Sequence, residues 1–318
     1  MPNQNASELP DILVSEFMDK AALEDFPEAW RVRYEPSLVD DRPRLMLYLA
    51  RARALIVRNR TQVDSELLAA APNLVAVGRL GVGLDNIDLD ACKAGGIEVL
   101  PATGANTLSV AEYVLSTALQ LARPAYTSNL AMIAGQWPRN ALIGGELSGR
   151  TMGLVGFGEI ARAVADRARA LGMRIAAYDP FLDEADSAWN DAENCPFESL
   201  LGKADILSLH VPLTPQTRGL IDATAIARMK NDAILINTAR GGVVDENMLA
   251  NALRGGQLGG AALDVFESEP LTADAGSVFA GLSNIILTPH IAGVTVEGNV
   301  RVSYLTVENV RRVLEAKQ

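Results

Sequence analysis

The stretch GLVGFGEIARAVADRARALGMRIAAYDP, residues 153–180, decides how this chain folds. An apolar run leads into Gly156, and Gly158 and Ala161 complete the pattern Gly-x-Gly-x-x-Ala; an amphipathic helix follows before a second apolar run ends in Asp179. The first glycine permits a tight strand-to-helix turn, and the second leaves room for an anion against the N–H groups that open the helix. The stretch therefore predicts a parallel α/β sheet with a dinucleotide site at this turn.

Asp179 indicates which dinucleotide binds. It follows the glycines by about 20 residues, where a carboxylate can accept hydrogen bonds from both hydroxyls of a ribose. A negative charge there also repels a 2′-phosphate, so the sequence favours NAD over NADP. The alternative is a structural glycine turn followed by a surface aspartate.

Short apolar runs alternate with amphipathic segments along the whole chain, which is typical of parallel sheets joined by helices. One series of strands is expected at residues 11–16, 54–59, 74–80 and 97–102, and a second at 151–157, 174–179, 205–211, 233–239, 260–266 and 284–289. Helices are expected at 61–71, 108–122 and 296–315, among others. The fold class is therefore α/β, with two doubly wound domains of Rossmann or flavodoxin type and a cleft between them as the ligand site.

The two long helices mark where the chain crosses from one series of strands to the other. We expect residues 105–293 to form an NAD-binding Rossmann domain. Residues 1–104 plus 294–318 then form a substrate-binding domain, which is discontinuous because the last helix returns to it.

Composition excludes several classes of function. The chain has 318 residues, of which 49% are hydrophobic, and a net charge of −11, which disfavours nonspecific binding to nucleic acid. No apolar run is long enough to span a membrane, and the N-terminal residues lack the pattern of a signal peptide. Cys92 and Cys195 are far apart and in no paired motif, so we expect neither a disulfide framework nor a metal site, and a cytoplasmic location.

Three polar stretches follow predicted strands of the second series. They are NTARGGVVDE with Arg240, LDVFESEP with Asp264 and Glu269, and LTPHIAG with His290, one of only two histidines. Taken singly, the arginine has the alternative of a surface salt bridge, the glutamate of a loop residue and the histidine of a helix cap. Together they place a cation, a carboxylate and an imidazole beside a nicotinamide, as hydride transfer to a 2-keto acid requires.

These motifs resemble those of the NAD-dependent D-2-hydroxyacid dehydrogenases, the family of 3-phosphoglycerate dehydrogenase. The resemblance covers nearly the whole chain and rests on GRLGVGLDNID (78–88), GANTLSVAEYV (104–114), GLVGFGEIA (153–161), HVPLTPQTRGLI (210–221), INTARGGVVDE (236–246), ALDVFESEP (262–270) and TPHIAG (288–293). It implies that Arg240, Glu269 and His290 are catalytic, with His290 as the acid/base group.

The resemblance also implies the residues that bind the ligands. Cofactor contacts are expected from Gly156, Gly158, Glu159, Ile160, Asp179, Val211, Thr238, Asp264 and Gly293. The backbone around Val82 and Gly83 matches the loop that receives the substrate carboxylate, and His210 lies beside the cofactor pocket. Members of the family commonly form homodimers through the NAD-binding domain, and Arg139 matches a basic residue offered across that interface.

The far end of the substrate is expected to meet Arg58 and Arg60. They lie two residues apart at the end of a strand, and so on the same side if the chain stays extended; a surface salt-bridge role is the alternative. In phosphoglycerate dehydrogenases an arginine of a similar stretch contacts the phosphate, which implies a substrate with a second anionic group.

Three stretches look most like those of (S)-sulfolactate dehydrogenases, which interconvert 3-sulfolactate and sulfopyruvate: VRNRTQVD, GRLGVGLDNID and HIAGVT. The sequence departs from phosphoglycerate dehydrogenases at Leu80, at Val82 and after HIAG. The alternatives are a 3-phosphoglycerate dehydrogenase, a glyoxylate/hydroxypyruvate reductase, and an NAD-sensing binding protein similar to the C-terminal-binding corepressors.

Overall fold

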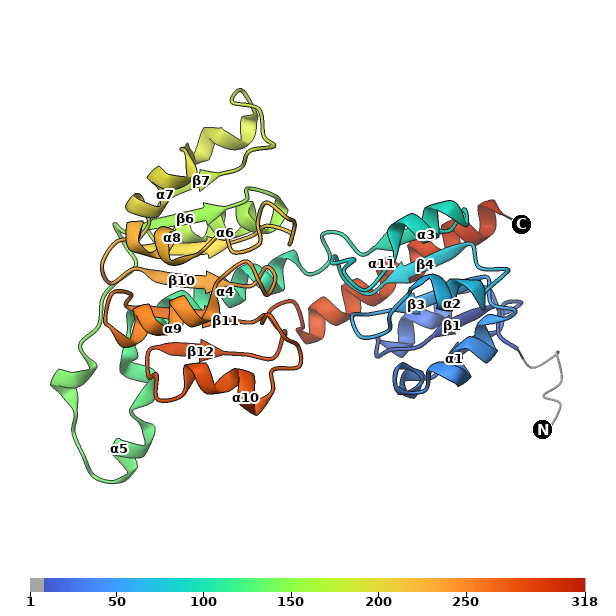
Figure 1. Ribbon diagram of the computed structural model, residues 1–318, viewed down its shortest axis with the longest axis horizontal. Helices are drawn as coiled ribbons and strands as arrows, with labels where there is room; N and C mark the ends of the chain where they lie inside the picture. Colours follow the sequence, from blue (N-terminus) through green and yellow to red (C-terminus); the bar gives the residue numbers. More distant parts are fainter. Residues whose placement is uncertain (1–8, 318) are drawn as a thin grey trace. The chain divides into compact units, whose positions relative to one another are not determined.

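The computed structural model describes residues 9–317, and the chain divides into two compact units. One unit contains the residues up to 106 together with those from 294 onward, and the other contains residues 107–293. Each unit is built on its own parallel sheet (Figure 1). The predicted fold class, two α/β domains of which the first is discontinuous, is confirmed.

The first unit has a five-stranded sheet in the order β2-β1-β3-β4-β5. This is the flavodoxin-like order, in which the chain reverses direction across the sheet at its first strand. The strands are β1 (Ile12–Val14), β2 (Val32–Tyr34), β3 (Ala54–Val57), β4 (Ala76–Arg79) and β5 (Glu98–Pro101). Strand β2 was not predicted, because its three residues are only half-buried and carry no apolar run.

One long helix completes this unit. Helix α11 (Val296–Ala316) packs on β3, β4 and β5, which Figure 1 shows as a red helix among blue and cyan elements. A Cβ on Gly78 of β4 would lie 2.7 Å from Val310 and 2.8 Å from Thr306, so only glycine lets the helix approach this closely. The other helical segments are η2 (Lys20–Asp25), η3 (Pro36–Asp40), α1 (Arg42–Leu49), α2 (Ser65–Ala69) and α3 (Leu89–Ala94).

The helix predicted over residues 61–71 is shorter in the structure. It begins at Ser65, where the Asp64 side chain accepts a hydrogen bond from the Leu67 N–H and so fixes the first turn. Val63 is fully buried but lies outside the helix, in an isolated bridge to Ile87. The prediction that Val63 belongs to the helix was therefore wrong, because the Asp64 cap makes the helix begin only at Ser65.

The second unit has a seven-stranded sheet in the order β12-β11-β10-β9-β6-β7-β8. This is the Rossmann order with one further strand at the edge, and the chain reverses between β6 and β9. The strands are β6 (Thr151–Val155), β7 (Arg174–Tyr178), β8 (Glu193–Asn194), β9 (Ile206–Leu209), β10 (Ile234–Asn237), β11 (Gly260–Leu263) and β12 (Ile285–Leu287). Strand β8 was not predicted, because its two residues are polar and exposed.

Helices cover both faces of this sheet, and a separate apolar cluster fills the space on each side. On one face α4 (Thr107–Ala122) packs against α6 (Glu159–Ala170); on the other lie α7 (Phe197–Lys203), α8 (Ala223–Arg228) and α9 (Glu246–Arg254). The remaining helical segments are η4 (Pro124–Thr127), α5 (Asn129–Ile133), η5 (Arg139–Leu142), η6 (Ser187–Asp191), α10 (Ala273–Gly276) and η7 (Ser277–Phe279). Within residues 9–317 no helix is both long and apolar enough to cross a membrane.

Candidate active site

The glycine-rich turn lies at the carboxyl end of β6, beside the point where the strand order reverses. Gly156 has φ +84°, and a Cβ there would lie 2.5 Å from the carbonyl oxygen of His210, so the fold itself requires this glycine. The fold itself does not require a glycine at position 158, because a Cβ there would meet nothing within 4 Å. The space above Gly158, at the exposed start of α6, fits an anion held by the helix N-terminus.

Asp179 follows β7 and faces the same turn. Its Oδ2 accepts a hydrogen bond from the Phe157 N–H at 2.8 Å, and its Oδ1 accepts one from the Phe181 N–H at 2.9 Å. Each carboxylate oxygen can accept a second bond. The side chain is therefore fixed in place with acceptor capacity left for the hydroxyls of a ribose.

Thr238 follows β10 and has a buried hydroxyl oxygen for which residues 9–317 offer no hydrogen-bond partner. A buried hydroxyl without a partner is costly unless a ligand supplies one. Val211 lies after β9 against the glycine turn, since its Cγ1 is 3.1 Å from the place a Cβ on Gly156 would take. The open space at Gly158 and the unpaired Thr238 hydroxyl both fit a bound dinucleotide.

His290 follows β12, and its ring is held by a carboxylate. The Nδ1 atom is 2.7 Å from Oε2 of Glu269, whose Oε1 accepts a hydrogen bond from the Phe266 N–H at 3.0 Å. Burial raises the pKa of Glu269, but the bonds from His290 and the Phe266 N–H outweigh it and lower the pKa below its usual value. An ionised Glu269 therefore fixes the proton on Nδ1 and leaves Nε2 for proton transfer.

The turn that carries His290 is fastened by Asp264. His290 has φ +55° and donates its N–H to the Asp264 carbonyl at 2.8 Å. The Asp264 carboxylate is buried and accepts from the N–H groups of Ile291 and Ala292, both at 2.8 Å, and from the Thr288 hydroxyl at 2.6 Å. Asp264 thus maintains a strained backbone position, a role that the sequence did not indicate.

Tyr113, which was not among the expected site residues, extends this network. The Tyr113 hydroxyl on α4 lies 2.5 Å from the Thr288 hydroxyl, which in turn donates to Asp264. Burial raises the pKa of Tyr113, so its phenol stays protonated at neutral pH. Helix α4 is therefore linked to the His290 turn through two hydroxyl groups.

Arg240 completes the predicted trio. Asn237, the last residue of β10, donates its amide to the Arg240 carbonyl at 3.0 Å and accepts the Ala239 N–H at 3.0 Å, which shapes the turn. A Cβ on Gly241 would lie 1.8 Å from the Phe266 carbonyl oxygen, so this turn passes directly against the segment that carries Glu269. The charge of Arg240 also contributes to the lowered pKa of Glu269. The structure brings the three predicted residues together from the ends of β10, β11 and β12, which are neighbours in the sheet.

His210, the other histidine, is placed differently. It follows β9, its Nε2 lies 3.0 Å from the Ser208 hydroxyl, and its carbonyl touches the glycine turn. Burial lowers the pKa of His210 to about 4, so the ring is neutral at physiological pH. It lies beside the turn expected to bind the cofactor and carries no charge there.

Arg58 and Arg60, in the first unit, do not share a direction. Arg58 donates from Nη1 to the Phe17 carbonyl at 3.1 Å and to Asn299 at 3.0 Å. Arg60 is largely exposed and forms an ion pair with Asp40. A common side was expected only if the chain stayed extended, and this condition is not met because the chain bends after β3.

The loop after β4 contains Val82 and Gly83. Neither of their N–H groups donates to any group within residues 9–317, and Val82 is 38% exposed. Arg79, which the sequence analysis did not single out, folds over this loop: its Nη1 donates to the Leu80 carbonyl at 3.0 Å, and it lies 1.7 Å from where a Cβ on Gly81 would be. Arg240 was identified because it directly follows a predicted strand, whereas Arg79 lies inside the strand predicted over residues 74–80, so the same signal did not identify it.

Comparison with known proteins agrees with this geometry. Residues 115–292 match the family model of the D-isomer specific 2-hydroxyacid dehydrogenase, NAD binding domain. The chain is 59% identical over 307 residues to the (S)-sulfolactate dehydrogenase of Chromohalobacter salexigens, covering 96% of this chain and 99% of that protein. This chain belongs to the D-isomer-specific 2-hydroxyacid dehydrogenases. It is an NAD-dependent oxidoreductase that acts on the CH–OH group of a 2-hydroxyacid.

Two further relatives of the dehydrogenase show the range of the family. The D-3-phosphoglycerate dehydrogenase of Mycobacterium leprae is 40% identical over 96% of this chain, which spans 57% of that protein's length. The crystal structure of D-lactate dehydrogenase from Aquifex aeolicus, complexed with NAD and lactic acid, superposes with a TM-score of 0.83 at 29% identity, covering 96% of this chain and 95% of that chain. The shared fold therefore extends over both units of the dehydrogenase.

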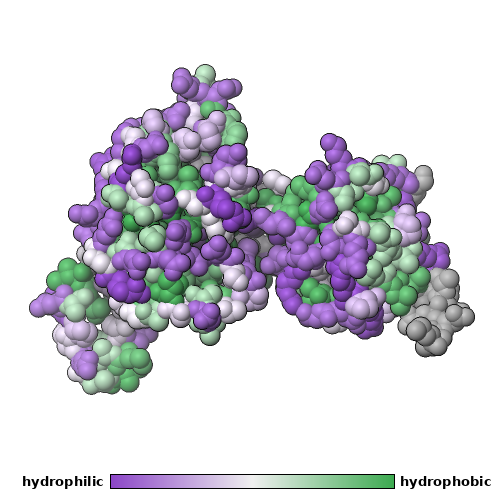
Figure 2. Space-filling view, in the orientation of Figure 1, coloured by the Kyte–Doolittle hydropathy of each residue, from purple (hydrophilic) through white to green (hydrophobic). Residues whose placement is uncertain are grey.

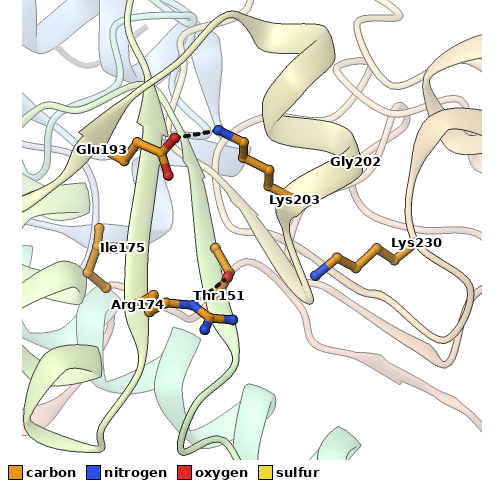
Figure 3. A pocket seen from close by; sticks show the side chains of 7 residues that line it. All are labelled: Thr151, Arg174, Ile175, Glu193, Gly202, Lys203 and Lys230. Atoms are coloured by element: carbon orange, nitrogen blue, oxygen red, sulfur yellow. Dashed lines mark hydrogen bonds and ion pairs between the residues drawn. The ribbon is translucent and has the colours of Figure 1, made fainter.

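A hollow of about 330 Å³ lies on the second unit away from these residues. Thr151 begins β6 and Arg174 begins β7, so the hollow is at the amino ends of the strands, opposite the glycine turn. Figure 3 shows Lys203 directed at Glu193, and Lys230 is paired with Asp205 at 2.8 Å. Because both lysines already have carboxylate partners, this hollow does not compete with the carboxyl edge as the site of the dehydrogenase reaction.

Proposed function

We propose that the dehydrogenase interconverts a D-configured 2-hydroxyacid and its 2-keto acid, and that the substrate carries a second anionic group, as 3-sulfolactate and sulfopyruvate do. The observation that carries the proposal is the 59% identity, over nearly the full length of both chains, to a (S)-sulfolactate dehydrogenase. Arg58, which directly follows β3, and Arg79, the last residue of the neighbouring strand β4, support it, because a sulfonate requires cationic partners.

Arg240 and His290 have different roles at C2, the carbon that reacts: Arg240 binds the substrate and His290 transfers the proton. Arg240 is the proposed cationic contact of the substrate in the second unit, and the N–H groups of Val82 and Gly83 are the proposed carboxylate-binding groups of the first unit. The Nε2 of His290 accepts the proton of the 2-hydroxyl, while Glu269 keeps the ring oriented through Nδ1 at 2.7 Å and stabilises the imidazolium that forms. NAD, when bound, would supply the acceptor for the hydride that leaves C2. In the reverse direction the same Nε2 returns the proton to the developing alkoxide.

The cofactor is held along the carboxyl edge of the seven-stranded sheet. The start of α6 would hold the pyrophosphate, Asp179 would accept hydrogen bonds from the adenosine ribose, and the Thr238 hydroxyl, which has no partner within residues 9–317, would donate toward the cofactor. The full proposed set is Gly156, Gly158, Glu159, Ile160, Asp179, Val211, Thr238, Asp264 and Gly293.

The second anionic group of the substrate is bound by the first unit. Arg58 uses only Nη1 toward its protein partners, and within residues 9–317 its Nε and Nη2 have none. Arg60 contributes only if it leaves Asp40, since the two form an ion pair at the surface. Arg58 is therefore the main contact, and Arg60 is an auxiliary one.

Initial rates with 3-sulfolactate, 3-phosphoglycerate and glycerate at saturating NAD test the substrate. We expect kcat/KM to be highest for 3-sulfolactate and at least about 100-fold lower for glycerate, since a lost charge-assisted pair weakens binding by this order. Preference for 3-phosphoglycerate would favour the second candidate, a 3-phosphoglycerate dehydrogenase, which the Mycobacterium leprae relative supports. Equal rates for all three acids would refute the second anionic group.

A homodimer formed through the second unit is part of the proposal. Residues 123–145, between α4 and β6, extend from the rest of the unit around α5 (Figure 1), and Figure 2 shows apolar surface on this segment at the lower left. The segment exposes Tyr126, Leu130, Met132, Ile133, Trp137 and Ile143. An apolar surface of this kind is typical of a protein interface. Arg139 is exposed on the same segment and is proposed to reach the substrate of the partner subunit.

Sedimentation velocity tests the dimer. Ile133→Asp places a charge on a side chain that is 84% exposed, so it should leave the folded unit intact and convert a dimer to monomers. A wild-type monomer would refute this part of the proposal.

A cytoplasmic location is also part of the proposal. It is supported by the two buried cysteines, which do not pair with each other.

A further inference from the structure

Glu16 is a buried carboxylate that the reaction described above does not use. It follows β1, is 5% exposed, and binds the loop after β3 through four consecutive backbone N–H groups. Oε1 accepts from Arg58 at 2.9 Å and from Thr61 at 2.9 Å, and Oε2 accepts from Asn59 at 3.3 Å and from Arg60 at 3.1 Å. The Glu16 side chain thus accepts a hydrogen bond from each backbone N–H group of residues 58–61.

Four consecutive N–H groups can meet one acceptor only if the backbone curls around it, as in the concave anion-binding turns of many proteins. An ionised carboxylate matches such a turn, because it accepts through both oxygens and donates nothing. Without it, the N–H groups of residues 58–61 would lack their partners, and each buried unpaired donor is costly. The curved path of this loop therefore depends on Glu16.

The segment that contains Glu16 contacts both the backbone and the guanidinium of Arg58. Its backbone N–H is bound by the Glu16 carboxylate, and its Nη1 donates to the carbonyl of Phe17, the next residue. The guanidinium carbon also lies 6.0 Å from the centre of the Phe17 ring. These contacts fix the position and direction of the guanidinium before any ligand binds.

We propose that Glu16 is a positioning residue that sets the specificity of the dehydrogenase for the second anionic group of its substrate, a proposal that rests on the proposed function. Glu16 does not touch the substrate. It acts by holding the loop of residues 58–61 so that Arg58 presents its remaining donors to a sulfonate or phosphate. Its own charge is compensated by the four N–H groups that surround it.

The test is Glu16→Gln, which keeps the size of the side chain but turns an NH₂ group toward two of the four donors. We expect KM for 3-sulfolactate to rise about tenfold or more, as expected for a mispositioned charged contact, with kcat within about twofold. KM for NAD and KM for glycerate, which lacks the second anionic group, should not change. Glu16→Asp keeps the carboxylate but shortens the side chain by one methylene. It should raise KM for 3-sulfolactate by a smaller factor and leave the other parameters unchanged.

Asp11→Asn is the matched control, because Asp11 lies just before β1, at the opposite end from Glu16, and pairs with Arg31 at 3.2 Å. It should lower the melting temperature without raising KM for 3-sulfolactate. If Glu16→Gln lowers kcat or raises every KM, its role is general stability and the proposal is refuted. If Glu16→Gln does not fold, Glu16→Asp is tested instead, and the proposal stands only if KM for 3-sulfolactate is the one parameter that rises.

These outcomes are separate from failure of the proposed function itself. If the wild-type enzyme does not prefer 3-sulfolactate to glycerate, the second anionic group is wrong and this inference falls with it. If the wild-type enzyme has the preference and both Glu16 variants retain it in full, the proposed function stands and the role of Glu16 is overturned.

Discussion

The two histidines of this chain follow strands of one sheet, yet their surroundings differ in almost every respect. His290 follows β12 with its Nδ1 on a carboxylate, a side chain that is 37% exposed and φ of +55°. His210 follows β9 with Nε2 against the hydroxyl of Ser208, and burial lowers its pKa to about 4. A carboxylate partner can stabilise a proton on the ring, whereas an enclosed site with a neutral partner excludes it.

The difference shows that position at a strand end does not define a catalytic histidine. Both side chains lie at the carboxyl edge where ligands bind in such sheets. The loop that follows β11 carries Glu269, which contacts the ring of His290, whereas the ring of His210 contacts the Ser208 hydroxyl. The proton-transfer role proposed for His290 therefore depends on the partner of its ring, and turnover should respond to changes in that partner.

The largest effect is expected from His290→Ala. Loss of the acid/base group should lower kcat by about 10²–10⁴-fold, while NAD binding measured by fluorescence titration stays within about twofold. The matched variant is His210→Ala, which should retain far more activity. Near-normal turnover of His290→Ala would remove the functional distinction between the two histidines.

Glu269→Gln should have the next largest effect, about 10–100-fold on kcat, because the amide no longer fixes the proton on Nδ1 or stabilises the imidazolium. The two residues act as one unit, so Glu269→Gln added to His290→Ala should cost little more. Steady-state rates of the two single variants and the double variant measure this coupling. Fully additive losses would contradict the pairing.

Tyr113→Phe should have a smaller effect, because it removes the outermost hydroxyl of the network behind the His290 turn. The Thr288 hydroxyl keeps its bond to Asp264, so we expect a loss of about 1 kcal/mol in stability and a fall in kcat of only a few-fold. Thermal melting and steady-state kinetics measure the two effects. A fall in kcat as large as that of Glu269→Gln would show that Tyr113 takes part in proton transfer.

His210→Gln should change turnover least but should alter the dependence of stability on pH. The pKa of His210 is about 4 in the folded protein, against the ordinary histidine pKa of 6.5, so between these pH values only the unfolded chain takes up the proton. The folded state therefore loses about 1.4 kcal/mol per pH unit as the pH falls from 6.5, about 3 kcal/mol by pH 4. Urea unfolding at pH 7 and at pH 4.5 should show a smaller difference for the variant. An unchanged difference would mean that His210 is protonated in the folded state.

The convergence of Arg240, Glu269 and His290 could be predicted because apolar runs mark the strands, and parallel strands bring the residues that follow them to one edge. No comparable rule exists for loops. The course of residues 58–61 is decided by Glu16, more than forty positions earlier in the chain and without a recognisable motif. The fastening of the His290 turn by Asp264 is a similar case, since a buried carboxylate at a strand end gives no indication of its partners.

Gly78 and the helix that packs on it bear on the order in which the chain folds during translation. One apolar cluster of the first unit joins Ile12 and Val14 to Val307 and Val310 of α11, so the first strands of this unit are completed by residues that are translated after the whole of the second unit. Residues 107–293, by contrast, have all their strands once β12 has been made. The unit that begins second can therefore fold first, while the N-terminal strands keep one apolar face uncovered until α11 arrives. Chaperones that recognise exposed apolar segments would meet this protein at its N-terminal sheet.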